Sequence, residues 1–199
     1  KMKIWQTLSD YKIAKVDNPK GVAADGVSEL KIYVSSTCEL TPDQLHIIFS
    51  CQGTQEQSDD VRGKVLEIVN KDKTGKTNNK SLEITYQAPP KFPLDVTKEY
   101  KVNLTLMVEM EDTIVVKTVP ISVVRTPVLL VHGLASDMNC FTILRKQMMQ
   151  YYQIWQLKTV DYSETNTSAF RENKFVVRDN ITRKFMTYAA NGYVVAKAD

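Results

Sequence analysis

The chain has 199 residues, of which 43% are hydrophobic and 25% are charged, and its formal net charge is +3. This length suffices for one ordinary domain or two small ones, and the hydrophobic content excludes a disordered or fibrous chain. The 26 basic and 23 acidic residues are spread along the sequence, so nucleic-acid binding is not expected. No apolar run approaches the roughly 18 residues of a membrane-spanning helix, so no transmembrane segment is expected.

The three cysteines, Cys38, Cys51 and Cys140, are an odd number at spacings that match no metal-binding pattern. A disulfide between Cys38 and Cys51 is disfavoured if residues 28–36 and 45–50 are hairpin partners, because the two thiols then lie too far apart along the hairpin. We therefore expect buried free thiols, since free cysteine usually behaves as a small apolar residue.

The first 124 residues consist of short segments rich in Val, Ile, Thr and Tyr, separated by clusters of Gly, Pro, Asn and Asp. Alternation of apolar and polar residues is clearest at 30–34 and 102–108, where every second side chain can be buried. The candidate strands are 12–16, 28–36, 45–50, 64–69, 81–86, 100–110 and 113–124. About seven strands suffice for an immunoglobulin-like β-sandwich. The lysine-rich stretch 70–80 is expected to be an exposed hairpin connection.

After Pro127 the pattern changes to one typical of α/β proteins. Val128–Val131 is a continuous apolar run, as in a strand buried on both faces of a parallel sheet. The spacing then predicts a helix over 138–152, a strand over 154–160, a helix over 170–190 stopped by Asn191-Gly192, and a strand from 193. This order predicts a parallel sheet and two domains, residues 1–125 and 126–199.

Two short motifs resemble bacterial immunoglobulin-like domains of the invasin type: Ala24-Asp25-Gly26-Val27-Ser28 before a strand, and Ile84-Thr85-Tyr86-Gln87-Ala88-Pro89 later in the chain. The resemblance covers roughly residues 10–124. It implies a spacer or adhesion module without catalytic residues of its own.

The most informative stretch is Pro127-Val-Leu-Leu-Val-His-Gly-Leu134, which resembles the strand and turn that begin the sheet of α/β-hydrolases of the bacterial lipase and esterase kind. Downstream, 160–166, 168–170 and Asn180-Ile181 look like the corresponding lipase region. The fold class expected from both resemblances is mixed: an all-β immunoglobulin-like sandwich followed by an incomplete α/β-hydrolase with a parallel sheet.

The hydrolase resemblance implies an oxyanion-hole role for His132, Gly133 and Leu134. Leu134 would supply a backbone N–H to the oxyanion, Gly133 would permit close backbone approach, and His132 would support the turn by hydrogen bonding rather than act as a base. Another reading remains open, because a buried strand ending in His-Gly occurs in other doubly wound folds. His132 would then be a core histidine with satisfied hydrogen bonds.

The catalytic triad of such an enzyme is absent from these residues. No two of the seven glycines lie four positions apart, which excludes a Gly-x-Ser-x-Gly elbow, and the only histidines are His46 and His132. The segment 193–199 looks like the strand that leads to the elbow in this family. We therefore expect an inactive amino-terminal fragment that ends before its nucleophile.

No cofactor or metal is expected. The sequence holds no glycine-rich phosphate loop, and the acidic groups Asp59-Asp60 and 109–112 lack the regular ligand spacing of a calcium loop. Solvated turns account for these carboxylates.

The expected function is that of a secreted or cell-surface bacterial carboxylic-ester hydrolase, with an ester or lipid as the substrate of the full-length parent. An alternative is a cell-surface or carbohydrate-binding adhesion module of immunoglobulin-like type. Because the predicted sheet is incomplete, its apolar edge is expected to be hidden by a homodimer, by a strand swap or by packing on the β domain.

Overall fold

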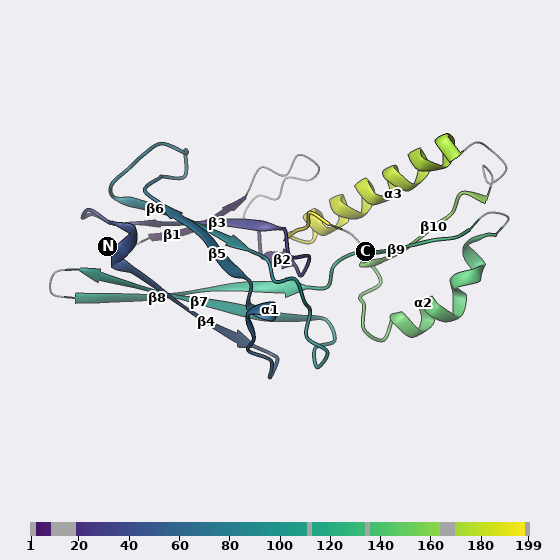
Figure 1. Cartoon of the computed structure of the whole chain (residues 1–199), viewed down its shortest axis with the longest axis horizontal. Helices are drawn as coiled ribbons and strands as arrows, with labels where there is room; N and C mark the ends of the chain where they lie inside the picture. The colour runs from purple at the N-terminus through teal and green to yellow at the C-terminus, as the bar shows by residue number, and fades with distance from the viewer. Residues whose placement is uncertain (1–2, 9–18, 111–112, 134–135, 164–169, 198–199) are drawn as a thin grey trace.

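The computed structural model describes residues 3–8, 19–110, 113–133, 136–163 and 170–197 (Figure 1). The described part of the chain is mostly β, with 40% of its residues in strands and 22% in helices. Within the described ranges the strands form a four-stranded, a five-stranded and a two-stranded sheet. No helix there combines the length and the hydropathy that crossing a bilayer requires.

The two larger sheets lie face to face and enclose the main core (Figure 1). The four-stranded sheet is antiparallel and has the order β1 (Lys3–Leu8), β3 (Glu29–Ser35), β6 (Ser81–Gln87) and β5 (Lys64–Val69). The five-stranded sheet is mixed and has the order β11 (Tyr193–Val194), β2 (Gly21–Ala23), β8 (Thr113–Val124), β7 (Glu99–Met110) and β4 (Leu45–Gln52). Alternate side chains of β3 and β7, such as Ile32 and Leu104, are fully buried between the sheets.

The remaining elements lie at one end of this sandwich. Strand β9 (Val128–Val131) pairs in parallel with β10 (Leu157–Val160). The helices between and after them are η2 (Met138–Phe141), α2 (Thr142–Met148) and α3 (Phe170–Ala190). Two short helices, η1 (Pro42–Gln44) and α1 (Asp59–Arg62), belong to the sandwich.

The expected fold class, an immunoglobulin-like sandwich followed by an incomplete parallel α/β-hydrolase sheet, is wrong. β9 and β10 do pair in parallel, but β11, the expected third strand, pairs in parallel with β2 of the five-stranded sheet instead. The physical reason is burial: Tyr193 packs with Ala23, Val124 and Tyr188 in a second apolar cluster against the sandwich. The sandwich itself is mixed, because β2 also pairs in parallel with β8.

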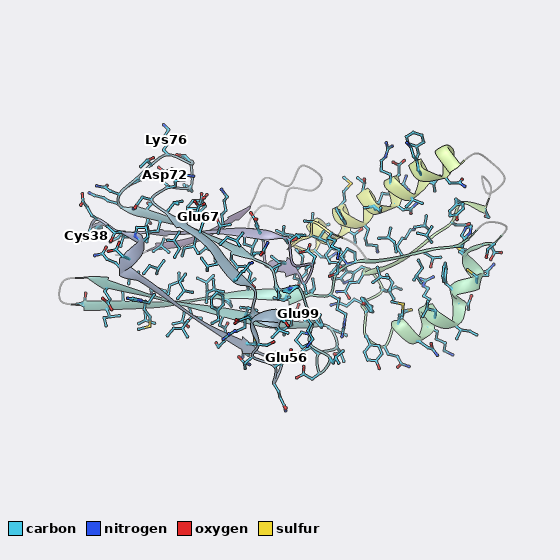
Figure 2. The ribbon with its side chains drawn as sticks, in the orientation of Figure 1. Cys38, Glu56, Glu67, Asp72, Lys76 and Glu99 are labelled. Carbon is cyan, nitrogen blue, oxygen red and sulfur yellow. The ribbon has the colours of Figure 1, made fainter. Side chains whose placement is uncertain are left out.

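Most of the individual strands of the β part were predicted closely. The expected strands 28–36, 45–50, 64–69, 81–86, 100–110 and 113–124 correspond to β3 to β8, whereas 12–16 lies outside the described residues and β1 and β2 were missed. The connection 70–80 is a mostly exposed turn, in which the Asp72 carboxylate accepts a bond from the Thr74 amide at 2.8 Å (Figure 2). Gly192, with φ of +84°, ends α3 as expected. The helix expected over 138–152 is shorter, comprising η2 and α2.

The cysteine prediction was only partly right. All three thiols are free, but Cys38 and Cys140 are exposed rather than buried. Cys51 is half-buried, and burial raises the pKa of its thiol. The hairpin argument also fails, because β3 and β4 belong to different sheets.

Hydrogen bonds to Asp25 connect the residues after β11 to the sandwich. Its buried carboxylate accepts bonds from the amides of Val27 and Ser28 and from the Ser28 hydroxyl, at 2.6 to 3.0 Å. The same carboxylate accepts the amides of Ala196 at 2.8 Å and Lys197 at 3.2 Å. One side chain thus joins the turn before β3 to the residues that follow β11.

Aromatic and basic side chains fill the junction between the sandwich and the β9–β10 pair. The Arg125 guanidinium lies 4.3 Å from the Phe92 ring centre and donates to the carbonyls of Val96 and Tyr151. The Tyr188 hydroxyl, on α3, donates to the Arg125 carbonyl at 2.6 Å. These contacts hold α3 and the start of β9 against the sandwich.

A buried lysine makes this junction sensitive to pH. Lys184 donates to the carbonyls of Trp155 and Leu157, and burial, with a smaller contribution from Lys158, lowers its pKa to about 8. Between about pH 8 and 10 the unfolded chain keeps this proton while the folded chain loses it. The contribution of Lys184 to stability therefore rises with pH across that interval.

We expect Lys184 to contribute a rise of about 2 kcal/mol in the free energy of unfolding between about pH 8 and 10, measured as the difference between the unaltered chain and Lys184→Met. The raised pKa values of Cys51, Tyr86, Tyr100 and Tyr188 act in the opposite direction over the same range, because unfolding lets these groups ionise. Urea titrations across this range measure the effect. Lys117→Met, at an exposed lysine, should keep the pH profile of the unaltered chain, whereas Lys184→Met should lack the Lys184 contribution; identical profiles in the two variants contradict the assignment.

Candidate functional site

The candidate site lies where β9 and β10 end. Parallel pairing in the register Val131 with Val160 brings the residues that follow the two strands together at one edge. His132 and Asp161 are those residues. The strands predicted at 128–131 and 154–160 therefore also place the expected His-Gly turn beside the Asp161–Ser163 segment, although β9 is half-buried to exposed and not, as expected, buried on both faces.

The His132 side chain is fully buried and both of its ring nitrogens have partners. Nδ1 lies 3.0 Å from the Gly133 carbonyl oxygen, and the Tyr162 amide donates to Nε2 at 3.3 Å. Because a carbonyl only accepts and an amide only donates, a neutral ring satisfies both contacts with its proton on Nδ1. In this state Nε2 is an occupied acceptor and is not available as a general base.

Tyr162 holds His132 in two further ways. The two rings stack with centres 4.1 Å apart and planes inclined by 17°. The Tyr162 hydroxyl also donates to the His132 carbonyl. The backbone and the ring of His132 are therefore both fixed by one residue of the neighbouring strand end.

Asp161 adds a charge at the rim of the site. Its carboxylate is 40% exposed and lies 3.4 Å from His132 Nε2. Hydrogen bonds from Ser163, and then the contact with His132, hold the pKa of this carboxyl below its usual range. Asp161 is therefore ionised near neutral pH and would pair with His132 if the ring became protonated.

The other expected site residues are placed as follows. Among the described residues no atom comes within 4 Å of a methyl group built on Gly133, so the turn faces open space there. Leu134 lies outside the described residues, as do 164–166 and 168–169. Asn180 donates to the Val176 carbonyl within α3, at 2.9 Å, and His46, on β4, pairs with Glu109 in the sandwich.

No protein-family model matches this chain, and no curated protein is similar enough to it to count as a relative. The resemblances to lipases and to invasin-type domains therefore stay predictions. The role of Tyr162 was missed at the sequence level, although its motif was noticed. A tyrosine directly after the second strand was the available signal, but nothing in the pattern pairs it with a histidine 30 positions earlier.

An apolar cavity of about 440 Å³ lies between the η2–α2 segment and β10. Met138, Phe141 and Met149 supply its apolar walls, Arg145 and Lys146 its basic groups, and Thr159 its floor on β10. Thr159 directly precedes the Val160–Val131 pair, so the cavity begins one residue from the end of the sheet. Its lining suits an apolar chain with a polar or anionic end.

Proposed function

We propose that this protein is part of a carboxylic-ester hydrolase of the bacterial lipase and esterase kind, in which the His132–Gly133–Leu134 turn supplies one donor of an oxyanion hole. The observation that carries the proposal is the position of the His132-Gly133 turn at the carboxyl end of the parallel β9–β10 pair, beside the apolar cavity, with Gly133 and Tyr162 occupying both His132 ring nitrogens. A histidine held in this way fixes a backbone turn at a sheet edge and takes no part in proton transfer.

Each residue of the turn then has a separate role. The Leu134 amide donates to the oxyanion of the tetrahedral intermediate, where a preorganised donor stabilises developing negative charge. Gly133 leaves room beside the turn, since a methyl group there meets none of the described residues within 4 Å. His132 and Tyr162 are positioning residues that set the direction of the turn.

An ester or lipid substrate fits the surroundings of the site. The apolar cavity along Met138, Phe141 and Met149 begins beside the same strand end and suits an acyl chain. The nucleophilic serine, the acid and the histidine base would come from sequence outside these 199 residues, because neither His46 nor His132 is placed to act as the base. We propose a secreted or cell-surface location for the whole enzyme.

Hydrolysis of p-nitrophenyl butyrate tests this proposal. The 199-residue chain is expected to give no turnover above buffer, whereas the complete product of its gene is expected to give turnover that a serine-directed inhibitor abolishes. Inhibitor-sensitive turnover by the 199-residue chain, or none by the complete product across short and long acyl chains, contradicts it.

The open edge of β9 favours self-association of this chain. Within the described residues β9 pairs only with β10, and Val131 at its end is 41% exposed. Parallel strands are normally buried in larger sheets, so we infer a homodimer or strand swap through this edge. Sedimentation velocity is expected to show a dimer that Val131→Lys weakens; a monomer at every concentration contradicts the inference.

A further inference from the structure

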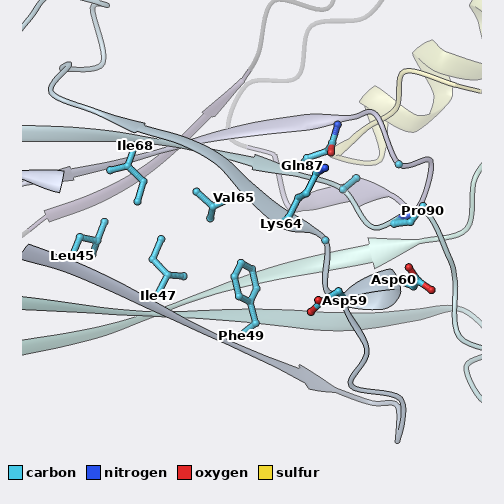
Figure 3. A pocket seen from close by; sticks show the side chains of 13 residues that line it. Leu45, Ile47, Phe49, Asp59, Asp60, Lys64, Val65, Ile68, Gln87 and Pro90 are labelled. Carbon is cyan, nitrogen blue, oxygen red and sulfur yellow. The ribbon is translucent and has the colours of Figure 1, made fainter. Parts of the chain in front are cut away.

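One long side of the sandwich is open. β4 ends the five-stranded sheet and β5 ends the four-stranded sheet on the same side, and a cavity of about 640 Å³ lies between them (Figure 3). Leu45, Ile47 and Phe49 of β4 face this groove from one sheet, and Val65 and Ile68 of β5 face it from the other. We call this space the β4–β5 groove.

The hydrogen bonds at Cys51 show which backbone groups of β4 face away from β7. The Gln57 side chain accepts from the Cys51 amide at 2.8 Å and donates to the Cys51 carbonyl at 3.1 Å. In an antiparallel ladder these outward groups recur at every second residue, so the amides and carbonyls of Ile47 and Phe49 also point outward. No other described strand pairs with them there.

Gln57 therefore occupies the place of one residue of a further strand. Its amide group offers a donor and an acceptor in the arrangement that a peptide backbone would offer. The edge continues past this side chain toward Phe49 and Ile47, where the same pairs of backbone groups stand beside apolar side chains. An occupant that pairs with these backbone groups and also covers the apolar side chains must itself be an extended peptide.

β4 lacks the features that protect edge strands from such pairing. Its eight residues contain no proline, no glycine and no Lys, Arg, Asp or Glu. β5 across the groove differs, since it carries Lys64, Glu67 and a bulge between Val65 and Glu67. Strand addition is thus directed to β4 and disfavoured at β5.

The charged residues of the groove indicate where a basic residue of the occupant would lie. Asp59 and Asp60 line the end beyond Phe49, with Lys64 on the β5 side (Figure 3). Asp59 is already paired with Arg62, so Asp60 is the carboxylate that a basic residue of the occupant would face at that end.

We propose that the β4–β5 groove binds an extended peptide of a partner protein, which adds as a strand to β4, buries alternate apolar side chains against Ile47, Phe49 and Val65, and places a basic residue near Asp60. This site is independent of the ester-hydrolase proposal, because none of its residues belongs to the β9–β10 end of the chain. It gives the sandwich a recognition function for unfolded or extended polypeptide segments.

The first test uses the intact chain and synthetic probes. The probe is an acetylated, fluorescently labelled peptide of about eight residues, with valine at alternate positions, threonine between them and a lysine at each end. Anisotropy is expected to show saturable binding. The same peptide with N-methyl groups on alternate amides keeps its side chains but loses its donors, and is expected to bind at least about tenfold more weakly.

Protein variants separate the backbone contact from the apolar contact. Ile47→Pro removes the outward amide hydrogen at an edge position where proline is tolerated, and Ile47→Ala removes the side chain but keeps that hydrogen. Ile47→Pro is expected to bind about tenfold more weakly than Ile47→Ala. Asp60→Asn is expected to weaken binding by about threefold at low salt, and not when the lysines are replaced by threonine.

Three results would overturn the proposal. They are equal binding of the N-methylated and unmodified peptides, no binding of the unmodified peptide, and competition between the unmodified peptide and dimerisation of the chain in sedimentation, which would mean that a second copy of the chain occupies β4. If Ile47→Pro fails to fold, the two peptides still decide the matter on the unaltered protein.

Discussion

Replacing Asp25 with alanine is expected to lower the free energy of unfolding by about 3 to 5 kcal/mol, because it removes one carboxylate that accepts five hydrogen bonds. Four of the donors are backbone amides and the fifth is the Ser28 hydroxyl. All five lose an ionic acceptor in a region from which water is largely excluded. Asp25→Asn keeps one acceptor oxygen and should lose about half as much.

Urea unfolding measures this loss, and hydrogen exchange locates it. The amides of Ala196 and Lys197 should lose protection first, because both donate to the Asp25 carboxylate. Asp43→Ala, at an exposed carboxylate of η1, is the control and should change stability by less than about 0.5 kcal/mol. A decrease of less than about 1 kcal/mol in the free energy of unfolding for Asp25→Ala, or unchanged hydrogen exchange at Ala196, would show that the hydrogen bonds to Asp25 contribute little to stability.

Replacing Leu134 with proline in the complete gene product is expected to lower kcat for p-nitrophenyl butyrate by about 10² to 10³, with little change in KM. Proline has no amide hydrogen, so the oxyanion loses one donor in the transition state while ground-state binding is retained. The prediction rests on the proposed function.

Leu134→Ala is the matched variant, since it shortens the side chain but keeps the amide hydrogen. Its loss of kcat should be much smaller than that of Leu134→Pro. Equal losses in the two variants would assign the effect to the side chain and contradict the oxyanion role. Circular dichroism of both proteins establishes that they are folded.

Long, regular strands could be predicted from the sequence, whereas short ones could not. β7 and β8 are each twelve residues long, and the expected ranges differ from the observed ones by at most one residue at an end. β11 has two residues, and no pattern of that length specifies a neighbour. Tertiary contacts determine its partner strand. These contacts are the burial of Tyr193 and the hydrogen bonds from Ala196 and Lys197 to Asp25, which lies 171 and 172 positions earlier in the sequence.

The candidate site shows the same division. The pattern Val128–Val131 was enough to predict a strand that ends before His132-Gly133, whereas the supporting role of His132 came from the resemblance to α/β-hydrolases and stays a prediction. The partner of that histidine was not predictable, because Tyr162 reaches His132 only through the parallel register of β9 and β10. The β4–β5 groove was not foreseen either, since it depends on which strands end each sheet.

The tautomer of His132 is the most direct test of the account, because the proposed role requires a ring that supports the turn and does not transfer protons. Nitrogen NMR of the ¹⁵N-labelled chain, with His46 as an internal reference, distinguishes a protonated ring nitrogen from an unprotonated one. The account predicts a neutral His132 ring with its hydrogen on Nδ1 and an acceptor at Nε2. A ring with its hydrogen on Nε2, or one that exchanges freely between the two forms, would contradict it.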